Sequence, residues 1–155
     1  MGWLVLAARL VVGGVWIVAG ALKIPDPASS VQAVRAYRLL PEAVVPTVGQ
    51  LLPVVEVVVG LALVVGLLTR TMAVTSAVLF VAFIIGIASA WARGLTIDCG
   101  CFGGGGYDPD AAEKYPWEIA RDVALLAGSL FVAAVGHRGR WALDHVLFRR
   151  TPLES

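Results

Sequence analysis

The sequence predicts an all-α membrane protein, a bundle of four transmembrane helices formed by one domain over residues 1–155. Hydrophobic residues make up 59% of the chain, charged residues 15%, and the mean hydropathy is +0.84. Soluble domains average about 45–50% apolar and roughly 25% charged residues, so a soluble domain of this composition would lack a polar surface. The chain is too apolar for disorder, two cysteines are too few for a secreted disulfide scaffold, and a net charge of +1 gives no electrostatic basis for binding nucleic acid.

Four segments are long and apolar enough to span a bilayer, which requires about 20 mostly apolar residues. They are Gly2–Leu22, Pro46–Leu68, Thr71–Ala92 and Trp117–Gly136. The third segment has no charged residue, the first contains Arg9, the second contains Glu56, and the fourth begins with Glu118, Arg121 and Asp122. None alternates apolar and polar residues as the strands of a transmembrane β-barrel do. We therefore expect four spanning helices.

The first segment is expected to stay in the mature protein, although Ala19-Gly20-Ala21 is similar to a signal-peptidase site. A signal peptide has basic residues before an uninterrupted apolar stretch. Here no basic residue precedes the apolar stretch, and Arg9 interrupts it. We interpret this segment as a retained helix.

The first long connection, residues 23–45, is predicted to contain a short helix on the membrane surface. Apolar residues follow Ser29 and Ser30 with three-residue spacing, the serines can cap a helix N-terminus, and Pro41 can end the helix. The second and third segments are joined by little more than Thr69 and Arg70, so they are expected to be antiparallel neighbours.

Two polar segments remain. The connection over residues 93–116 is rich in glycine and acidic residues. The tail Arg138–Arg150 is predicted to form a basic amphipathic helix at the membrane surface.

The 12 lysines and arginines divide equally between the two sides of a four-span protein, so their number does not set its orientation. The density of arginine in the tail favours termini in the cytoplasm. In the cytoplasmic (inner) membrane, both cysteines then lie on the oxidising, extracytoplasmic side.

The strongest chemical signal is Cys99-Gly100-Cys101, just after the third predicted span. Two cysteines separated by one residue close only a small, strained disulfide ring, and glycine supplies the backbone freedom, including positive φ, that closure requires. Strained and exposed disulfides are labile, which is typical of catalytic rather than structural bridges. We therefore interpret Cys99 and Cys101 as catalytic. Two alternatives stay open: inert loop thiols, or a metal site, for which two thiols without a nearby histidine are a poor ligand set.

Charged residues are expected close to the cysteines. Lys23, Arg93 and Arg121 each lie at the same end of a different predicted helix, and positive neighbours lower the pKa of a thiol. Asp98 and Asp122 either oppose this effect or accept protons. The alternative role of such charges is anchoring at the membrane surface.

Glu56 lies within the second predicted span, about 15 Å from its start. Arg9, counted back from Lys23, lies at a similar depth, so we expect a buried Arg9–Glu56 pair inside the bundle. Such a pair either fixes helix packing or marks a proton or quinone site. Pro53, one turn before Glu56, is expected to kink the helix beside it.

The sequence resembles the MauE/DoxX-like membrane proteins, and the Cys-Gly-Cys loop places the resemblance in the MauE, or methylamine utilisation, branch. The resemblance covers the chain to about residue 135 and is carried by Arg9 with Gly13-Gly14, Gly20–Pro27, Tyr37–Pro41, Glu56, Asp98–Gly103 and Arg121-Asp122. It implies a four-helix inner-membrane protein connected with thiol or disulfide redox outside the cytoplasm. In the methylamine system such proteins look like helpers in the maturation of a disulfide-rich dehydrogenase subunit, alongside a thioredoxin-like partner.

We therefore expect an integral membrane thiol–disulfide redox protein in which Cys99 and Cys101 exchange disulfides with an exported thioredoxin-like or disulfide-rich partner. This function needs no cofactor beyond the cysteines. One alternative is quinone-linked electron transfer through a pocket near Glu56. Another is a non-catalytic membrane scaffold or chaperone for the maturation of an exported enzyme.

Overall fold

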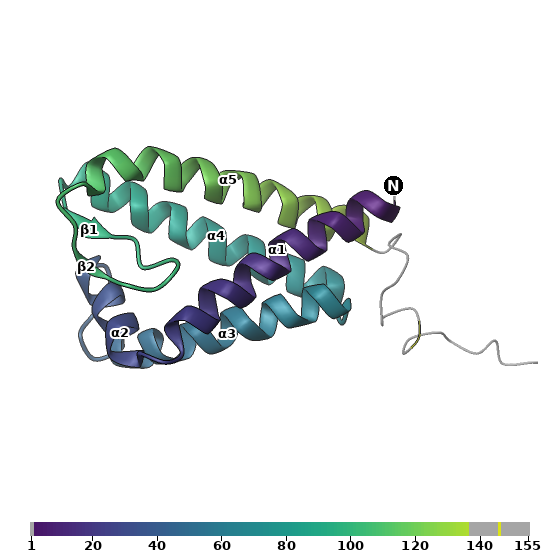
Figure 1. The fold of residues 1–155 in the computed structure, drawn as a ribbon, viewed down its shortest axis with the longest axis horizontal. Coiled ribbons are helices and arrows are strands. Elements are labelled where there is room, and N and C mark those ends of the chain that lie inside the picture. The colour runs from purple at the N-terminus through teal and green to yellow at the C-terminus, as the bar shows by residue number, and fades with distance from the viewer. Residues whose placement is uncertain (1, 137–145, 147–155) are drawn as a thin grey trace, which may run out of the picture.

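The structure is a computed structural model that describes residues 2–136 and Val146 (Figure 1). Its helices are α1 (Gly2–Lys23), α2 (Pro27–Ala36), α3 (Val45–Val65), α4 (Thr69–Ala92) and α5 (Ala111–Val135). Two short strands, β1 (Ile97–Asp98) and β2 (Gly106–Tyr107), pair antiparallel. The predicted tail helix, Arg138–Arg150, lies outside the described residues apart from Val146. The expected all-α membrane architecture is confirmed, with a small sheet that the sequence analysis did not predict.

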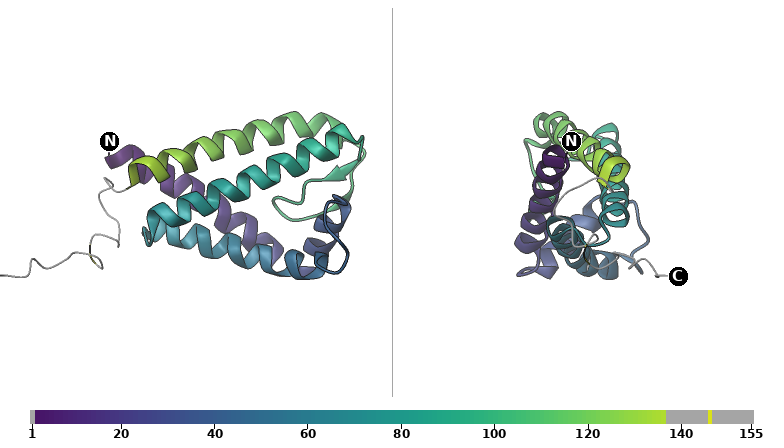
Figure 2. Two further views of the ribbon diagram at one scale, coloured as in Figure 1. Left: turned by 180° about the vertical axis from the view of Figure 1, so that it is seen from behind. Right: turned by 90° about the vertical axis from the view of Figure 1, so that its right-hand side faces the viewer.

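The four long helices run the length of the molecule (Figures 1 and 2). α1 lies along α3, and α4 lies along α5. The short helix α2 and the two strands lie together at one end, which we call the loop end. The N-terminus and the turn between α3 and α4 lie at the other end. Both long connections therefore meet at the loop end.

Three helices of the described part, α1, α3 and α4, are long and apolar enough to cross a membrane. Large apolar side chains such as Leu4, Val58, Val78 and Ile85 are exposed on them, as expected for surfaces that face lipid. α5 has 25 residues, but charged residues are concentrated in its first half. Three of the four predicted spans are thus supported by length and composition, and the fourth stays a prediction.

The turn between α3 and α4 differs slightly from the predicted one. α3 ends at Val65 because Gly66 adopts a left-handed conformation, with φ of +80°, that a helix cannot continue. The backbone N–H groups of Gly66 and Leu67 donate to the carbonyl of Ala62, which closes the helix end. The second predicted span therefore ends before residue 68, and α4 begins at Thr69.

Glycines allow α1 and α3 to pack with their backbones in contact. A Cβ on Gly13 would lie 2.8 Å from the carbonyl oxygen of Gly60, and a Cβ on Gly20 would lie 2.6 Å from that of Pro53. Small residues at such crossings permit the close approach that replaces the hydrophobic effect inside a membrane. We call this contact the glycine seam. It fixes the antiparallel register of α1 on α3, with residue 13 beside residue 60 and residue 20 beside residue 53.

A polar contact in the middle of the bundle joins the two helix pairs. Trp16 of α1 donates a hydrogen bond from Nε1 to Ser76 Oγ of α4 (2.7 Å), and Ser76 Oγ is hydrogen-bonded to Ser129 Oγ of α5 (2.8 Å). The Trp16 ring also packs on Phe80, with 4.5 Å between ring centroids. These buried groups satisfy one another, so the bundle is held by directional contacts as well as by packing.

The predicted short helix in the first connection is confirmed as α2, but its N-cap is different. The Asp26 side chain accepts a hydrogen bond from the backbone N–H of Ser29 (3.0 Å), and Pro27 occupies the first turn. Asp26 thus takes the capping role assigned to Ser29 and Ser30, because proline is favoured directly after the cap, where its missing N–H costs nothing.

The glycine seam provides the first testable prediction. We expect Gly13→Ala to destabilise the bundle by about 1–3 kcal/mol, the usual cost of overpacking, because its Cβ would collide with the α3 backbone. Gly14→Ala is the matched control: its Cβ would meet no atom of the described residues within 4 Å, so alanine should be neutral or stabilising there. Thermal unfolding of the purified variants in detergent measures both. Equal stability of the two variants would contradict the assigned register.

Candidate functional site

The cysteines lie in a tight turn that leads from β1 into the glycine-rich segment. The Asp98 carboxylate accepts a hydrogen bond from the backbone N–H of Gly100 (2.8 Å), and the N–H of Cys101 donates to the sulfur of Cys99 (3.2 Å). Gly100 has a φ of +67°, which confirms the positive φ expected between the cysteines. Both cysteines are free thiols. The turn therefore holds the two sulfur-bearing residues next to each other without a bond between them.

The turn is packed against α2. A Cβ on Gly100 would lie 2.7 Å from the Cβ of Ala33, and a Cβ on Gly105 would lie 2.6 Å from the same atom. The phenol of Tyr37 donates a hydrogen bond to the carbonyl of Cys99 (2.9 Å). Glycine is needed at both positions for close approach as well as for φ. The surface helix and the cysteine loop thus form one unit at the loop end.

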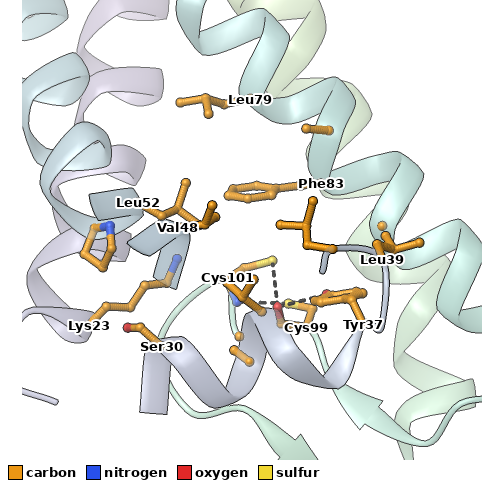
Figure 3. A pocket seen from close by; sticks show the side chains of 17 residues that line it. Lys23, Ser30, Tyr37, Leu39, Val48, Leu52, Leu79, Phe83, Cys99 and Cys101 are labelled. Carbon is orange, nitrogen blue, oxygen red and sulfur yellow. Dashed lines mark hydrogen bonds between the residues drawn. The ribbon is translucent and has the colours of Figure 1, made fainter. Parts of the chain in front are cut away.

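A cavity of about 360 Å³ lies behind the cysteines, between α2, α3 and α4 (Figure 3). Cys99 and Cys101 are 9% and 8% exposed, and both line this cavity. In Figure 3 the ring of Phe83 lies across the cavity from the cysteines, with Val48 and Leu52 beside it. The thiols therefore adjoin an apolar interior space and are largely shielded from the outer surface.

The prediction that Glu56 pairs with Arg9 is wrong, because Glu56 pairs with Lys23 instead. Glu56, fully buried, accepts a hydrogen bond from Lys23 Nζ at 2.7 Å. Arg9 donates instead to the carbonyls of Leu63 and Val64, at 2.9 and 3.2 Å. The glycine seam explains the difference, since it places residue 9 about two helical turns beyond Glu56 along α3 and leaves the long Lys23 side chain to reach Glu56.

The three predicted cations are all at the loop end but differ in what they contact. Lys23 lines the cavity together with the cysteines. Arg121 lies over the ring of Phe102, 4.8 Å from its centroid, and pairs with buried Asp122 (3.0 Å). Arg93 donates to the carbonyl of Tyr37, so it supports the end of α2.

The pKa of the Cys101 thiol is raised well above its ordinary value, contrary to the prediction that nearby cations lower it. The interaction with Cys99 is the main cause, burial adds to it, and Asp122 acts in the same direction. Arg121 lowers the pKa but is outweighed. Burial also raises the pKa of Tyr37, which therefore stays a neutral hydrogen-bond donor to the loop. Cys101 is accordingly a protonated thiol at neutral pH.

Sequence reasoning missed several side chains that shape the site. Tyr115 of α5 donates to the carbonyl of Leu95 (2.7 Å) and accepts from the N–H of Ile97 (3.2 Å), so it anchors the start of the cysteine loop. Glu118, one turn further along α5, has a carboxyl group that interacts with the Cys99 thiol. The sequence showed Glu118 only as one of the charged residues at the start of the fourth predicted span. Its spacing from Cys99 and Cys101 did not indicate that it contacts either cysteine.

Comparison with known proteins gives two matches and one negative result. Residues 1–135 match the family described as Methylamine utilisation protein MauE. The chain is 36% identical over 129 residues to a Paracoccus denitrificans protein named Methylamine utilization protein MauE, across 82% of this chain and 67% of that protein. No solved structure matches the chain.

The buried ion pair yields a stability prediction. We expect Glu56→Gln to lower the free energy of unfolding by about 3–5 kcal/mol, because it leaves the Lys23 ammonium buried without its counter-charge. The double variant Lys23→Met with Glu56→Leu should recover most of this loss, since apolar residues of similar size can replace a buried pair. Thermal unfolding in detergent measures both. If Glu56→Gln is as stable as the parent protein, the pair is not the buried contact described here.

The raised pKa of Cys101 predicts its reactivity. In reduced protein we expect alkylation of Cys101 by N-ethylmaleimide to rise with pH with a midpoint above the ordinary value of about 8.5, because only the thiolate reacts. Arg121→Gln removes the charge that lowers the pKa, so the midpoint should move to still higher pH. Initial rates by mass spectrometry give the profile. A midpoint below that of a free cysteine would refute the assignment.

Proposed function

This chain belongs to the MauE family, and we propose that it is an integral membrane thiol–disulfide redox protein acting in methylamine utilisation. The observation that carries the proposal is the geometry of Cys99 and Cys101: two free thiols one residue apart, in a turn that Gly100 closes with positive φ. A turn of this kind holds a dithiol ready for closure. The family match and the name of the Paracoccus denitrificans relative support the role in methylamine utilisation.

The proposed reaction is reversible exchange with the disulfide of a partner protein. The thiolate of Cys99 attacks one partner sulfur, the partner's S–S bond breaks, and a mixed disulfide forms. Cys101 then attacks Cys99, which closes the Cys99–Cys101 disulfide and releases the partner as a dithiol. Cys99 is assigned the attack because the raised pKa keeps Cys101 protonated at neutral pH. Glu118, which interacts with the Cys99 side chain, is placed to accept its proton.

Access to the thiols requires the loop to move away from α2. Both cysteines are buried, and the loop is held there by the hydrogen bond from Tyr37 to Cys99 and by one from Ser29 Oγ to the Gly104 carbonyl (2.9 Å). These are single neutral hydrogen bonds, each contributing about 0.5–1.5 kcal/mol. A docking partner can displace them at modest cost, so α2 acts as a cover over the dithiol.

The proposal includes the membrane arrangement. α5 is the fourth span: it lies along α4, and its charges are gathered in the half nearer the loop end. The termini are in the cytoplasm and the cysteine loop is outside, in the inner membrane. The partner is then an exported thioredoxin-like or disulfide-containing protein, and the chain assists the maturation of an exported enzyme. A membrane scaffold without redox chemistry is the competing function that the experiment must exclude.

Single-cysteine variants test the proposal. In Cys101→Ser the resolving thiol is missing, so Cys99 should accumulate a mixed disulfide with an exported protein, visible on a non-reducing gel and abolished by dithiothreitol. In Cys99→Ser we expect little adduct, because the remaining Cys101 thiol is protonated at neutral pH. Mass spectrometry of the adduct identifies the partner.

The double variant Cys99→Ser with Cys101→Ser is the control for function. It should fold but lose its activity in methylamine utilisation in cells. Absence of an adduct from both single variants, together with full activity of the double variant, would refute the redox function and support the scaffold. An adduct formed only with cytoplasmic proteins would overturn the proposed orientation.

A further inference from the structure

The cavity behind the cysteines lies where a ligand can enter from the lipid. α3 and α4 meet at their turn and diverge towards the loop end, as Figure 1 and the left view of Figure 2 show. The cavity lies between the diverging ends, with Leu52 and Pro53 of α3 on one side and Ala82 and Phe83 of α4 on the other. Both helices are candidate membrane spans. A ligand that enters between them therefore comes from the bilayer and is lipid-soluble.

The lining of the cavity combines apolar walls with a few polar groups. Most lining residues are aliphatic or aromatic, and a volume of about 360 Å³ suits a ring-sized ligand. Among the described residues, the polar side chains of the lining besides the thiols are Lys23, Ser30 and Tyr37. The Lys23 ammonium lies 5.7 Å from the centroid of the Phe83 ring, so one charged donor is held beside the aromatic wall.

Ser30 provides a second indication of a ligand. Its side chain lines the cavity, the residue is only 6% exposed, and Oγ has no hydrogen-bond partner among the described residues. A buried hydroxyl left unpaired is destabilising, and native structures rarely keep one without a reason. A ligand with an acceptor oxygen at this position would satisfy it. Ser30 and Lys23 therefore indicate a ligand that is apolar in its body and carries hydrogen-bond acceptors.

We propose that the cavity binds a lipid-soluble quinone that oxidises the Cys99–Cys101 dithiol. The two S–H bonds break and the S–S bond forms, while two electrons and two protons convert the quinone to a hydroquinone. The quinone ring lies between Phe83 and the cysteines, and its carbonyl oxygens accept hydrogen bonds from Ser30 and Lys23. This inference rests on the proposed redox function, running in the direction in which an exported dithiol reduces the Cys99–Cys101 disulfide. The quinone is then the electron acceptor that oxidises the same site again.

The apolar walls favour a quinone over a segment of the protein partner. A peptide segment in the cavity would bury backbone N–H and C=O groups against apolar side chains that cannot pair with them, which is costly. A quinone has two acceptor oxygens and no donor, which matches the donors at Ser30 and Lys23. The outer side of the loop is then free for the exported partner. The dithiol would thus react with the quinone on the side facing the membrane and with the partner on the outer side.

The test uses the full chain, reduced and then freed of reductant, in lipid nanodiscs. Decylubiquinone and menadione are the probes, hydroquinone formation is followed by absorbance, and remaining thiols are counted after denaturation. We expect one hydroquinone for each pair of thiols lost. Ser30→Ala should raise the quinone concentration needed for half-maximal rate about two- to tenfold, as expected for one hydrogen bond, without lowering thermal stability.

A matched pair of variants on α4 tests the location. Ala82→Trp fills the cavity and should reduce quinone-dependent oxidation by at least about tenfold. Val81→Trp adds the same side chain at a neighbouring exposed position outside the lining, and should keep the parent rate. Equal rates in the two variants would refute the cavity as the quinone site.

Diamide, a direct thiol oxidant, separates this inference from the proposed function. If diamide closes the Cys99–Cys101 disulfide and neither quinone does, the quinone site is refuted and thiol exchange stands. If neither diamide nor quinone closes the disulfide, both are refuted. Oxidation by quinone that is equal in the Ser30→Ala, Ala82→Trp and parent proteins would show reaction without a site, and would also overturn the inference.

Discussion

The close contact of α1 with α3 is the constraint on which the rest of the structure depends. At Gly13 and Gly20 there is no room for a side chain between the two backbones, so the register of the helices cannot slide. That register brings Lys23 to Glu56 and leaves Arg9 with the carbonyls near the end of α3. Because α2 follows directly after α1, the same contact also positions the surface helix that carries Ala33 and covers the cysteine loop.

The loop end combines features that a purely structural bundle does not need. A buried ion pair is weak evidence for stability, since apolar residues often serve as well. Here Lys23 also lines a cavity with two thiols. The Ser30 hydroxyl, which has no hydrogen-bond partner among the described residues, lies in the same lining. The dithiol is held by α2 and the loop on one side and adjoins membrane helices on the other. This arrangement suits a protein that transfers electrons between an exported partner and the bilayer.

Composition and motif spacing were sufficient to predict the main features of the fold. Apolar length identified α1, α3 and α4, and the Cys-Gly-Cys spacing correctly predicted a positive φ at Gly100. Helix length and the backbone conformation of a short turn depend mainly on neighbouring residues, so they can be predicted from a short stretch of sequence. α5 was predicted as a fourth span from its apolar stretch, and this stays a prediction, because the charges in its first half leave α5 outside the three helices that length and composition support as spans.

Properties that depend on packing could not be predicted in this way. The partner of Glu56 was predicted by counting residues from the end of each helix. The glycine seam instead sets the register of α1 on α3, and this register decides which residue of α1 reaches Glu56. The pKa of Cys101 was expected to fall because cations are nearby, but burial and Cys99 outweigh Arg121. The cavity is lined by residues from α1, α2, α3, α4 and the cysteine loop, so no single stretch of sequence contains its signal.

The most direct test of the account is the redox state of the tryptic peptide Gly94–Lys114, which contains both cysteines. Membranes holding the full chain are equilibrated in glutathione buffers of increasing oxidation, blocked with acid and an alkylating agent, and digested. We expect a reversible change, within a single chain, from a doubly alkylated peptide to an unalkylated peptide. The unalkylated peptide should be lighter than the dithiol peptide by two hydrogen atoms. Thiols that stay fully alkylated in every buffer, or that cross-link only between chains, would contradict it.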